Sequence, residues 1–258
     1  MPQFKRSDAT IHYEIAGNGP PLLLIAGTAS DNASWGPLLP LLPGRQLVMP
    51  DNRGSGRTES KGPIDIDQIV EDTVALLDHL GIAEADIVGH SLGGMIGLRL
   101  AARYPDRVRR LVTLTSGNVP GAKERALFRD MERHYFTMHP EDWFRLLFQW
   151  LFSTPFFTDE ANIAAAAAAS IAYPWRQSPE NFARQVKAID RMAAEDLRKI
   201  RCPVLAVAGS LDLLVPPAAV TAGHNGVRNL TLTTLPAAHS IHWEAPQAVA
   251  DAINGFLS

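Results

Sequence analysis

Cysteine is almost missing from this chain of 258 residues, which contains a single one. One cysteine cannot form an internal disulfide or a zinc site built from cysteines, so the cytoplasm, a reducing compartment, is the simplest expectation. Runs of basic residues are missing as well. The chain has 24 basic and 27 acidic side chains, for a formal net charge of −3. This balance favours neither a nucleic-acid partner nor an anionic membrane surface.

Long apolar stretches are also missing. No run reaches the roughly 18 residues that a membrane-spanning helix requires. The first residues, MPQFKRSDATIHYE, lack the apolar core of a signal peptide. Because 46% of the residues are hydrophobic and 20% are charged, the composition is that of a folded globular domain and excludes wholesale disorder. We therefore expect a soluble globular protein.

The sequence does contain short apolar runs that alternate with longer amphipathic segments. This pattern predicts an α/β fold with a mostly parallel sheet flanked by helices. Strands are expected at 4–6 and 11–15, which form a hairpin, and then at 22–26, 46–50, 86–89, 108–114, 204–209 and 230–235. Apolar residues at helical spacing predict helices at 66–80, 92–104 and 246–257.

The stretch 118–198 interrupts this alternation. It contains no convincing strand, is rich in aromatic residues, and includes six consecutive alanines at 164–169, which favour a helix. We expect a helical cap over 118–198, inserted between two core strands, with 1–117 and 199–258 forming the α/β core. Trp143, Phe148 and Trp150 are candidates for the wall of an apolar substrate pocket, although core packing accounts for each of them equally well.

The sharpest motif is GHSLG at 89–93, which fits G-x-S-x-G between a predicted buried strand and a predicted helix. Glycine at both ends allows a tight turn that exposes the Oγ of Ser91. The same turn directs the N–H of Leu92 toward a developing oxyanion at the helix N-terminus. An ordinary glycine-rich turn has the same local pattern, so the motif needs partners elsewhere in the chain.

A serine nucleophile needs a base and a carboxylate that orients the base, in the order Ser, acid, His for this motif. Asp212 follows the predicted strand 204–209, and His239 follows the last predicted strand. The loop at 115–118 contains no carboxylate, which favours Asp212 as the acid. His242 competes with His239 as the base, and we prefer His239 because it comes directly after the strand-ending PAA at 236–238.

Two further segments carry a family resemblance. DNRGSGRT at 51–58 matches D-x-R-G-x-G-x-[ST], and Ala26-Gly27 followed by Trp35 matches H-G-x7-W except at its first residue. From about residue 10 to its end, the chain resembles α/β-hydrolase-fold proteins, in particular the esterases, 3-oxoadipate enol-lactonases and aminoacrylate hydrolases. The resemblance implies that the N–H of Thr28 forms the second half of the oxyanion hole. Ala26, where most relatives have histidine, bears on the geometry of this loop rather than on activity.

These patterns predict a serine hydrolase that cleaves a carboxylic ester or lactone of a small, partly apolar substrate through an acyl-enzyme. No cofactor is expected, and no metal either, because no spacing of metal ligands is visible. Three alternatives stay open. They are amide, carbamate or carbon–carbon bond hydrolysis of the aminoacrylate or diketone type, a perhydrolase or haloperoxidase-like activity, and a non-catalytic ligand receptor on this fold. Self-association of the chain also stays open.

The other polar residues of note have plainer interpretations. Asp51 and Arg53 are expected to hold their loop together rather than to contact substrate. Cys202 is expected to be a packed residue and not a nucleophile. The histidines outside the motifs are expected at the surface or partly buried, at positions 12, 79, 134, 139 and 224.

Overall fold

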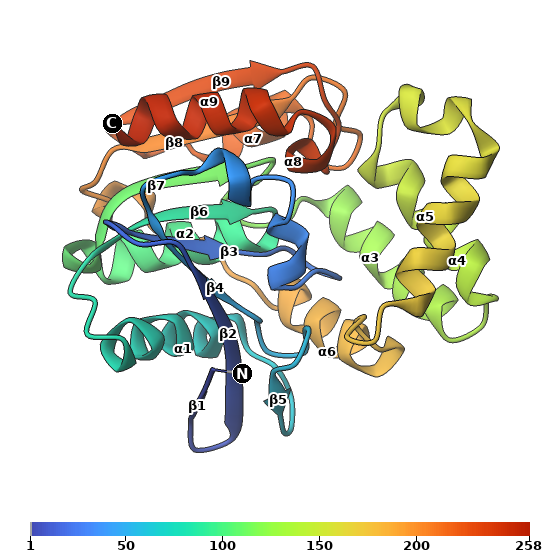
Figure 1. Ribbon diagram of the computed structural model, residues 1–258, viewed down its shortest axis with the longest axis horizontal. Coiled ribbons are helices and arrows are strands. Elements are labelled where there is room, and N and C mark those ends of the chain that lie inside the picture. The colour runs from blue at the N-terminus through green and yellow to red at the C-terminus, as the bar shows by residue number, and fades with distance from the viewer. Residues whose placement is uncertain (1) are drawn as a thin grey trace.

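A nine-stranded sheet forms the centre of the computed structural model, which describes residues 2–258 (Figure 1). Its strands lie in the order β1-β2-β4-β3-β6-β7-β8-β9, and β5 pairs with β2. All pairs that involve β2 are antiparallel and all others are parallel, as the sequence predicts. The strands are β1 (Gln3–Lys5), β2 (Ala9–Ala16), β3 (Pro21–Ile25), β4 (Gln46–Pro50), β5 (Glu59–Ser60), β6 (Ala85–His90), β7 (Val108–Leu114), β8 (Val204–Gly209) and β9 (Leu230–Leu235).

The apolar runs located these strands closely. The predicted bounds agree with those of β4, β7, β8 and β9, and the other predicted ends differ by about one or two residues, as strand ends commonly do. Every residue of β6 and of β8 is buried, which explains why β8 is apolar throughout and why β6 has an apolar centre. The sequence did not reveal β5, because its two residues are ordered by pairing with Ala9 and Thr10 of a distant strand.

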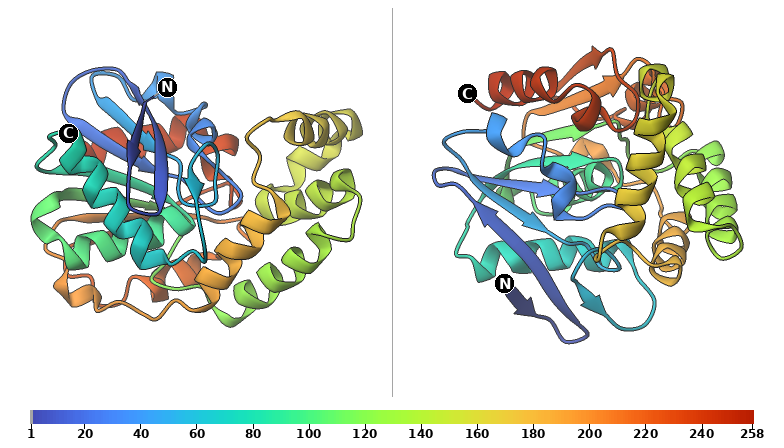
Figure 2. Two further views of the ribbon diagram at one scale, coloured as in Figure 1. Left: turned by 90° about the horizontal axis from the view of Figure 1, so that it is seen from below. Right: turned by 45° about the vertical axis from the view of Figure 1, so that its right-hand side comes forward.

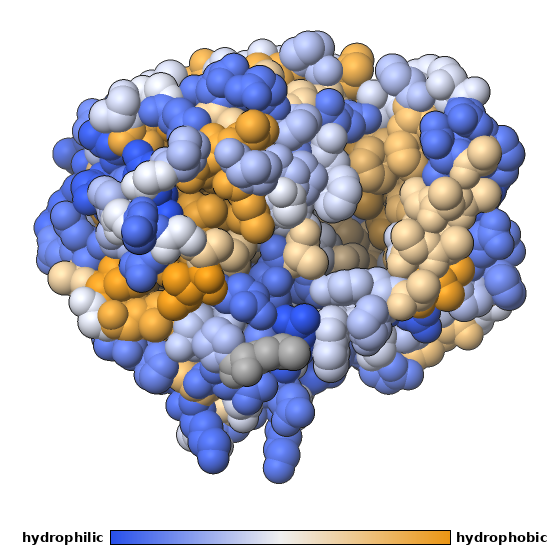
Figure 3. Space-filling view, viewed as in Figure 1, coloured by the Kyte–Doolittle hydropathy of each residue, from blue (hydrophilic) through white to orange (hydrophobic). Residues whose placement is uncertain are grey.

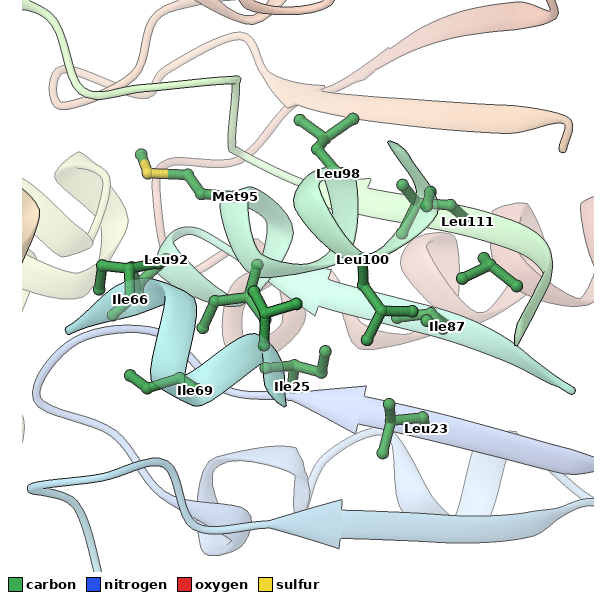
Figure 4. Packing of buried hydrophobic residues seen from close by; sticks show 14 of the residues in the cluster. Leu23, Ile25, Ile66, Ile69, Ile87, Leu92, Met95, Leu98, Leu100 and Leu111 are labelled. Atoms are coloured by element: carbon green, nitrogen blue, oxygen red, sulfur yellow. The ribbon is translucent and has the colours of Figure 1, made fainter. Parts of the chain in front are cut away.

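Helices cover both faces of the sheet (Figures 1 and 2). Leu23 and Ile25 of β3 pack toward α1 (Ile66–His79) and α2 (Leu92–Arg103), as Figure 4 shows. Leu22 and Leu24 of the same strand point to the other face, because side chains alternate along a strand. There they pack with α8 (Ile241–Glu244) and α9 (Pro246–Leu257). Within residues 2–258, no helix has both the length and the apolar character to span a bilayer.

Between β7 and β8 the chain forms a helical segment, which we call the cap and which lies in the stretch 118–198 where the sequence predicts one. The cap contains α3 (Ala122–Tyr135), α4 (Pro140–Leu151), α5 (Glu160–Ala172) and α6 (Pro179–Asp190). The six alanines lie in α5. The cap has its own apolar cluster, which includes Trp143 and Phe182. It stands beside the carboxyl ends of the parallel strands (Figures 1 and 2), where loops from the core meet it.

Candidate active site

Ser91 occupies the sharp turn between β6 and α2. Its φ of 51° and ψ of −116° lie in a region that costs a non-glycine residue about 1–3 kcal/mol. The turn is fixed by its neighbours, since Ser91 N donates to Leu114 O at 3.0 Å and Ser116 Oγ donates to Ser91 O at 2.6 Å. A Cβ at Gly93 would lie 1.9 Å from Ile25 O, so this position of the motif requires glycine. The fold therefore holds Ser91 in a strained conformation.

Asp212 and His239 are brought together from two different loops. Asp212 Oδ2 lies 2.9 Å from His239 Nδ1, and both side chains are buried. The other carboxylate oxygen accepts hydrogen bonds from Leu214 N and Val215 N, each at 2.8 Å. Because Asp212 is fixed in this way, it holds the proton of the imidazole on Nδ1 and leaves Nε2 free to accept one.

The backbone of His239 is fixed as tightly as its ring. His90 Nε2 donates to His239 O at 2.9 Å, and Thr115 Oγ1 donates to the same oxygen at 3.0 Å. The next residue, Ser240, donates its N–H to Leu151 O in the cap at 2.8 Å. The His239 loop is therefore held by both the core and the cap.

Ser91 and His239 line one cavity of about 70 Å³, together with Thr28. No hydrogen bond joins Ser91 Oγ to the His239 ring within the part of the chain that the structure describes; such contacts often form only when substrate binds. A smaller recess beside it is lined by Thr28, Ser91 and Leu92. Since α2 begins at Leu92, its N–H has no acceptor inside the helix. The structure thus brings together the five residues that the sequence singled out for the reaction.

The three aromatic candidates of the cap separate into two groups. Trp150 lines the cavity that contains Ser91. Trp143 and Phe148 line a second, larger cavity of about 340 Å³. Trp143 is also a core residue of the cap, because it stacks on Tyr135 with ring centroids 3.7 Å apart and its Nε1 donates to Met131 O at 2.9 Å.

The loop at 51–58 supports the site without entering the cavity of Ser91. Asp51 accepts hydrogen bonds from Asn32 N, Asn32 Nδ2 and Arg57 N. Arg53 forms ion pairs with two carboxylates, Asp8 and Asp72, and their hydrogen bonds raise the pKa of its guanidinium. Asn52 Nδ2 donates to Ala26 O at 2.9 Å and so fixes the loop at the position where the resemblance expects histidine.

Two of the histidines outside the motifs are buried, contrary to expectation. His224 is enclosed between Thr113 Oγ1 at 2.8 Å and Val220 O at 2.7 Å. His12 Nε2 lies 3.1 Å from Glu14 and 2.9 Å from Arg57 Nη1. Thr113 and Arg57 come from distant parts of the chain, so local sequence could not indicate the burial. Cys202 is buried as expected, and burial raises the pKa of its thiol to about 11.

His242 is buried close to the loop that carries His239. Its ring lies 4.5 Å from that of His90 and 5.2 Å from that of Trp35, measured between centroids. Neither of its ring nitrogens has a hydrogen-bond partner among residues 2–258. Burial lowers the pKa of His242 to about 3 and also lowers the pKa of His90. Both rings are therefore neutral near pH 7.

Glu244 is a structural residue whose contacts the sequence did not reveal. One carboxylate oxygen accepts from Ser153 N at 2.6 Å and from Ser153 Oγ at 2.8 Å, in the cap. The other accepts from Ala238 N at 2.6 Å, next to His239. In the sequence, Glu244 is marked only by its position five residues after His239. Glu244 thus ties the cap to the loop that carries His239.

Comparison with known proteins agrees with this geometry. The family described as the alpha/beta hydrolase fold matches residues 20–246. The chain belongs to the α/β-hydrolase fold family. It is accordingly an enzyme, an α/β-fold hydrolase.

Two relatives and a solved structure match the chain over nearly its full length. A protein of Azorhizobium caulinodans named as a candidate carbamate hydrolase, RutD, is 29% identical over 99% of this chain and 98% of its own. Pyrrolizixenacetamide deacetylase of Xenorhabdus hominickii is 30% identical over 100% of this chain and 98% of its own. The crystal structure of the enol-lactonase from Burkholderia xenovorans matches with a TM-score of 0.87 and 27% identity, over 99% of both chains.

The buried His242 gives a prediction about the pH dependence of stability. An unfolded chain protonates histidine near pH 6.5, whereas the pKa of folded His242 is about 3. Between these values the unfolded state binds a proton that the folded side chain does not. The free energy of unfolding should therefore fall as the pH drops from 6.5 toward 3, by up to about 1.4 kcal/mol per pH unit for this residue.

The His242→Leu variant tests this pH dependence. The difference in Tm between pH 7 and pH 5 should be smaller in the variant than in the wild type. The variant lacks the histidine that binds a proton in the unfolded state but not in the folded state. Equal differences in both proteins would contradict the prediction.

Proposed function

We propose that the protein is a serine hydrolase that cleaves a carboxylic ester or lactone through an acyl-enzyme. One observation carries this proposal: the strained Ser91 shares a cavity with His239, whose Nδ1 is held by Asp212 at 2.9 Å. Such a reaction requires a nucleophile close to an oriented base, and a strained turn is typical of the nucleophile in the G-x-S-x-G motif.

The geometry supports the following steps. The Nε2 atom of His239 takes the proton of Ser91 as Oγ attacks the acyl carbon. The oxyanion lies between the N–H groups of Thr28 and Leu92. These donors are in position before the reaction starts, so they do not have to reorient during it. His239 then gives its proton to the departing group, and a water molecule activated by the same ring releases the acid. Asp212 stabilises the imidazolium formed in between.

Amide or carbamate hydrolysis is the second candidate for the same three residues. The names of the two relatives at 29% and 30% identity favour it, since one is a deacetylase of an acetamide and the other a candidate carbamate hydrolase. The enol-lactonase structure favours the lactone instead. The chemistry on Ser91 is shared, so the choice concerns the bond and not the site.

A panel of four substrates tests both candidates. Phenyl acetate, δ-valerolactone, acetanilide and a phenyl carbamate are incubated with the purified enzyme, and the acid, phenol or amine released is measured. We expect turnover of the ester and the lactone, and labelling of Ser91 by a fluorophosphonate. Turnover of the amide or carbamate alone favours the second candidate. A protein that turns over none of the four and is not labelled contradicts both.

Asp212→Asn should fold normally and lose about 10⁴-fold in kcat, because an amide favours the wrong tautomer of His239. The hydrogen bonds from Leu214 N and Val215 N can still be accepted by the amide oxygen, which preserves the loop. The measurement is kcat for phenyl acetate together with a circular dichroism melt. A folded variant with near-normal kcat would remove Asp212 from the mechanism.

A further inference from the structure

The larger cavity lies beside the cavity of Ser91 and continues it beneath the cap. The two share six lining residues: Ala29, Ser30, Leu147, Leu151, Ser240 and Trp243. We call the cavity of about 340 Å³ the cap cavity. Figure 3 shows a hollow with apolar walls between the core and α5, on the side where the cap lies. A volume of this size lies in the ordinary range for small-molecule sites.

The position of the cap cavity relative to His239 indicates which part of a substrate it receives. In the proposed reaction His239 protonates the departing group, so that group leaves on the side of His239. The cap cavity is lined by Ser240, the residue after His239, and by Trp243 of the adjoining helix α8. It therefore lies on the leaving-group side.

The small recess beside Ser91 offers little room. It is lined by Thr28, Leu92, Leu214 and other residues, but by neither His239 nor Ser240, and its volume is about 10 Å³. This is space for about one water molecule. An acyl group that extends into this recess can therefore be no larger than about an acetyl group, whereas the leaving group can be bulky.

A buried carboxylate is part of the wall of the cap cavity. Asp31 lines it and is 6% exposed. Its oxygens accept hydrogen bonds from Ala33 N at 2.9 Å and from the hydroxyl of Tyr173, in the cap, at 2.8 Å. No basic side chain of residues 2–258 forms an ion pair with it, and burial raises the pKa of Asp31. A carboxylate can accept about four hydrogen bonds, so a ligand can donate to it.

A second acceptor lines the same cavity. Gln177 is 7% exposed, and its Nε2 donates to Gly54 O at 2.7 Å. Its Oε1 accepts no hydrogen bond from any described residue of the chain. Buried polar atoms without partners are uncommon and favour a ligand that supplies the missing donor. The cation that lines the cavity, Arg176, is exposed.

We propose that the cap cavity is the leaving-group site and that Asp31 and Gln177 bind a hydrogen-bond donor there. The substrate class is then a short-chain acyl ester or amide of a bulky, largely apolar alcohol or amine that carries a second amino or hydroxyl group. This inference rests on the proposed function, because it uses the side on which His239 releases the leaving group.

Two series of esters test the assignment of the two sides. In the first series, p-nitrophenyl acetate, butyrate and octanoate vary the acyl group, and kcat/KM should fall at least about tenfold from acetate to octanoate. In the second, the acyl group stays acetyl while the phenol carries a para substituent: propyl, 3-hydroxypropyl or 3-aminopropyl. One or both esters with a donor should exceed the propyl ester about tenfold or more in kcat/KM. The better of the two identifies the donor.

Variants connect this preference to Asp31. In Asp31→Asn, the ratio of kcat/KM between the preferred donor ester and the propyl ester should drop toward one. Tyr173→Phe, which removes the hydroxyl that donates to Asp31, should change the ratio while the carboxylate remains. The matched control is Asp190→Asn, a carboxylate of the same cap that lines neither cavity; it should keep the wild-type ratio.

The outcomes distinguish this inference from the proposed function. If a fluorophosphonate fails to label Ser91 and none of the acetates is hydrolysed, the proposed function itself is wrong. Suppose that Ser91 is labelled and the acetates are hydrolysed. If kcat/KM is then higher for the octanoate than for the acetate, or equal for the acetates of the three substituted phenols, only the assignment of the cap cavity is overturned. A ratio that Asp31→Asn leaves unchanged also overturns it.

Discussion

Ser91→Ala is expected to lower kcat for phenyl acetate by about 10⁵- to 10⁶-fold, because the residues of a catalytic triad act as a unit and the nucleophile has no substitute. The fold should persist. Alanine lacks only Oγ, and the backbone bonds that hold the turn, from Ser91 N to Leu114 O and from Ser116 Oγ to Ser91 O, do not involve that atom. The measurement is single-turnover and steady-state hydrolysis with the melting curve of the same sample.

Labelling and a control serine complete this test. A fluorophosphonate should modify the wild type at Ser91 alone and leave Ser91→Ala unmodified. Ser60→Ala changes a serine on β5 that lines neither cavity, and it should keep both labelling and rate. Labelling at another serine, or hydrolysis at the wild-type rate in Ser91→Ala, would show that Ser91 is not the nucleophile.

His239→Ala should lower kcat by an amount similar to that of Ser91→Ala, because the loss of the base disables the same unit. The neighbouring His242 serves as its matched control. His242 is buried and neutral, and its ring contacts His90 and Trp35 without hydrogen-bonding Asp212. His242→Ala should therefore retain most of the turnover.

His242→Ala should lower the stability of the protein although it keeps the activity. Removing the buried ring of His242 leaves a cavity, which costs on the order of 2–4 kcal/mol by analogy with other large-to-small core changes and should lower Tm. Comparing kcat and Tm for both variants separates the two roles. If His242→Ala loses activity and His239→Ala keeps it, the base has been assigned to the wrong histidine.

The strands and the nucleophile could be predicted because their signals are local. The run at 204–209 has the bounds of β8, and every residue of that strand is buried, so an apolar side chain at each position had one simple interpretation. The Ser91 turn was predictable for a similar reason, since the glycines that its geometry requires stand within two residues of it.

The pairing of Asp212 with His239 was predicted from chain order and from the absence of a carboxylate at 115–118, not from local structure. The structure adds what chain order could not give. It shows that Leu214 N and Val215 N hold one oxygen of Asp212, and that His90 and Thr115 hold the carbonyl of His239. These bonds form only after separate strands have assembled.

By itself, the sequence determined every strand of the sheet except β5 and the tight turn at Ser91, and it predicted the helical segment between β7 and β8. Only the tertiary structure decided the burial of His12 and His224, the division of the site into two cavities, and the contact of Asp31 with Tyr173, a residue 142 positions away. The physical reason is range. Backbone conformation and side-chain periodicity act over a few residues, whereas burial and cavity shape depend on elements that meet only in the folded protein.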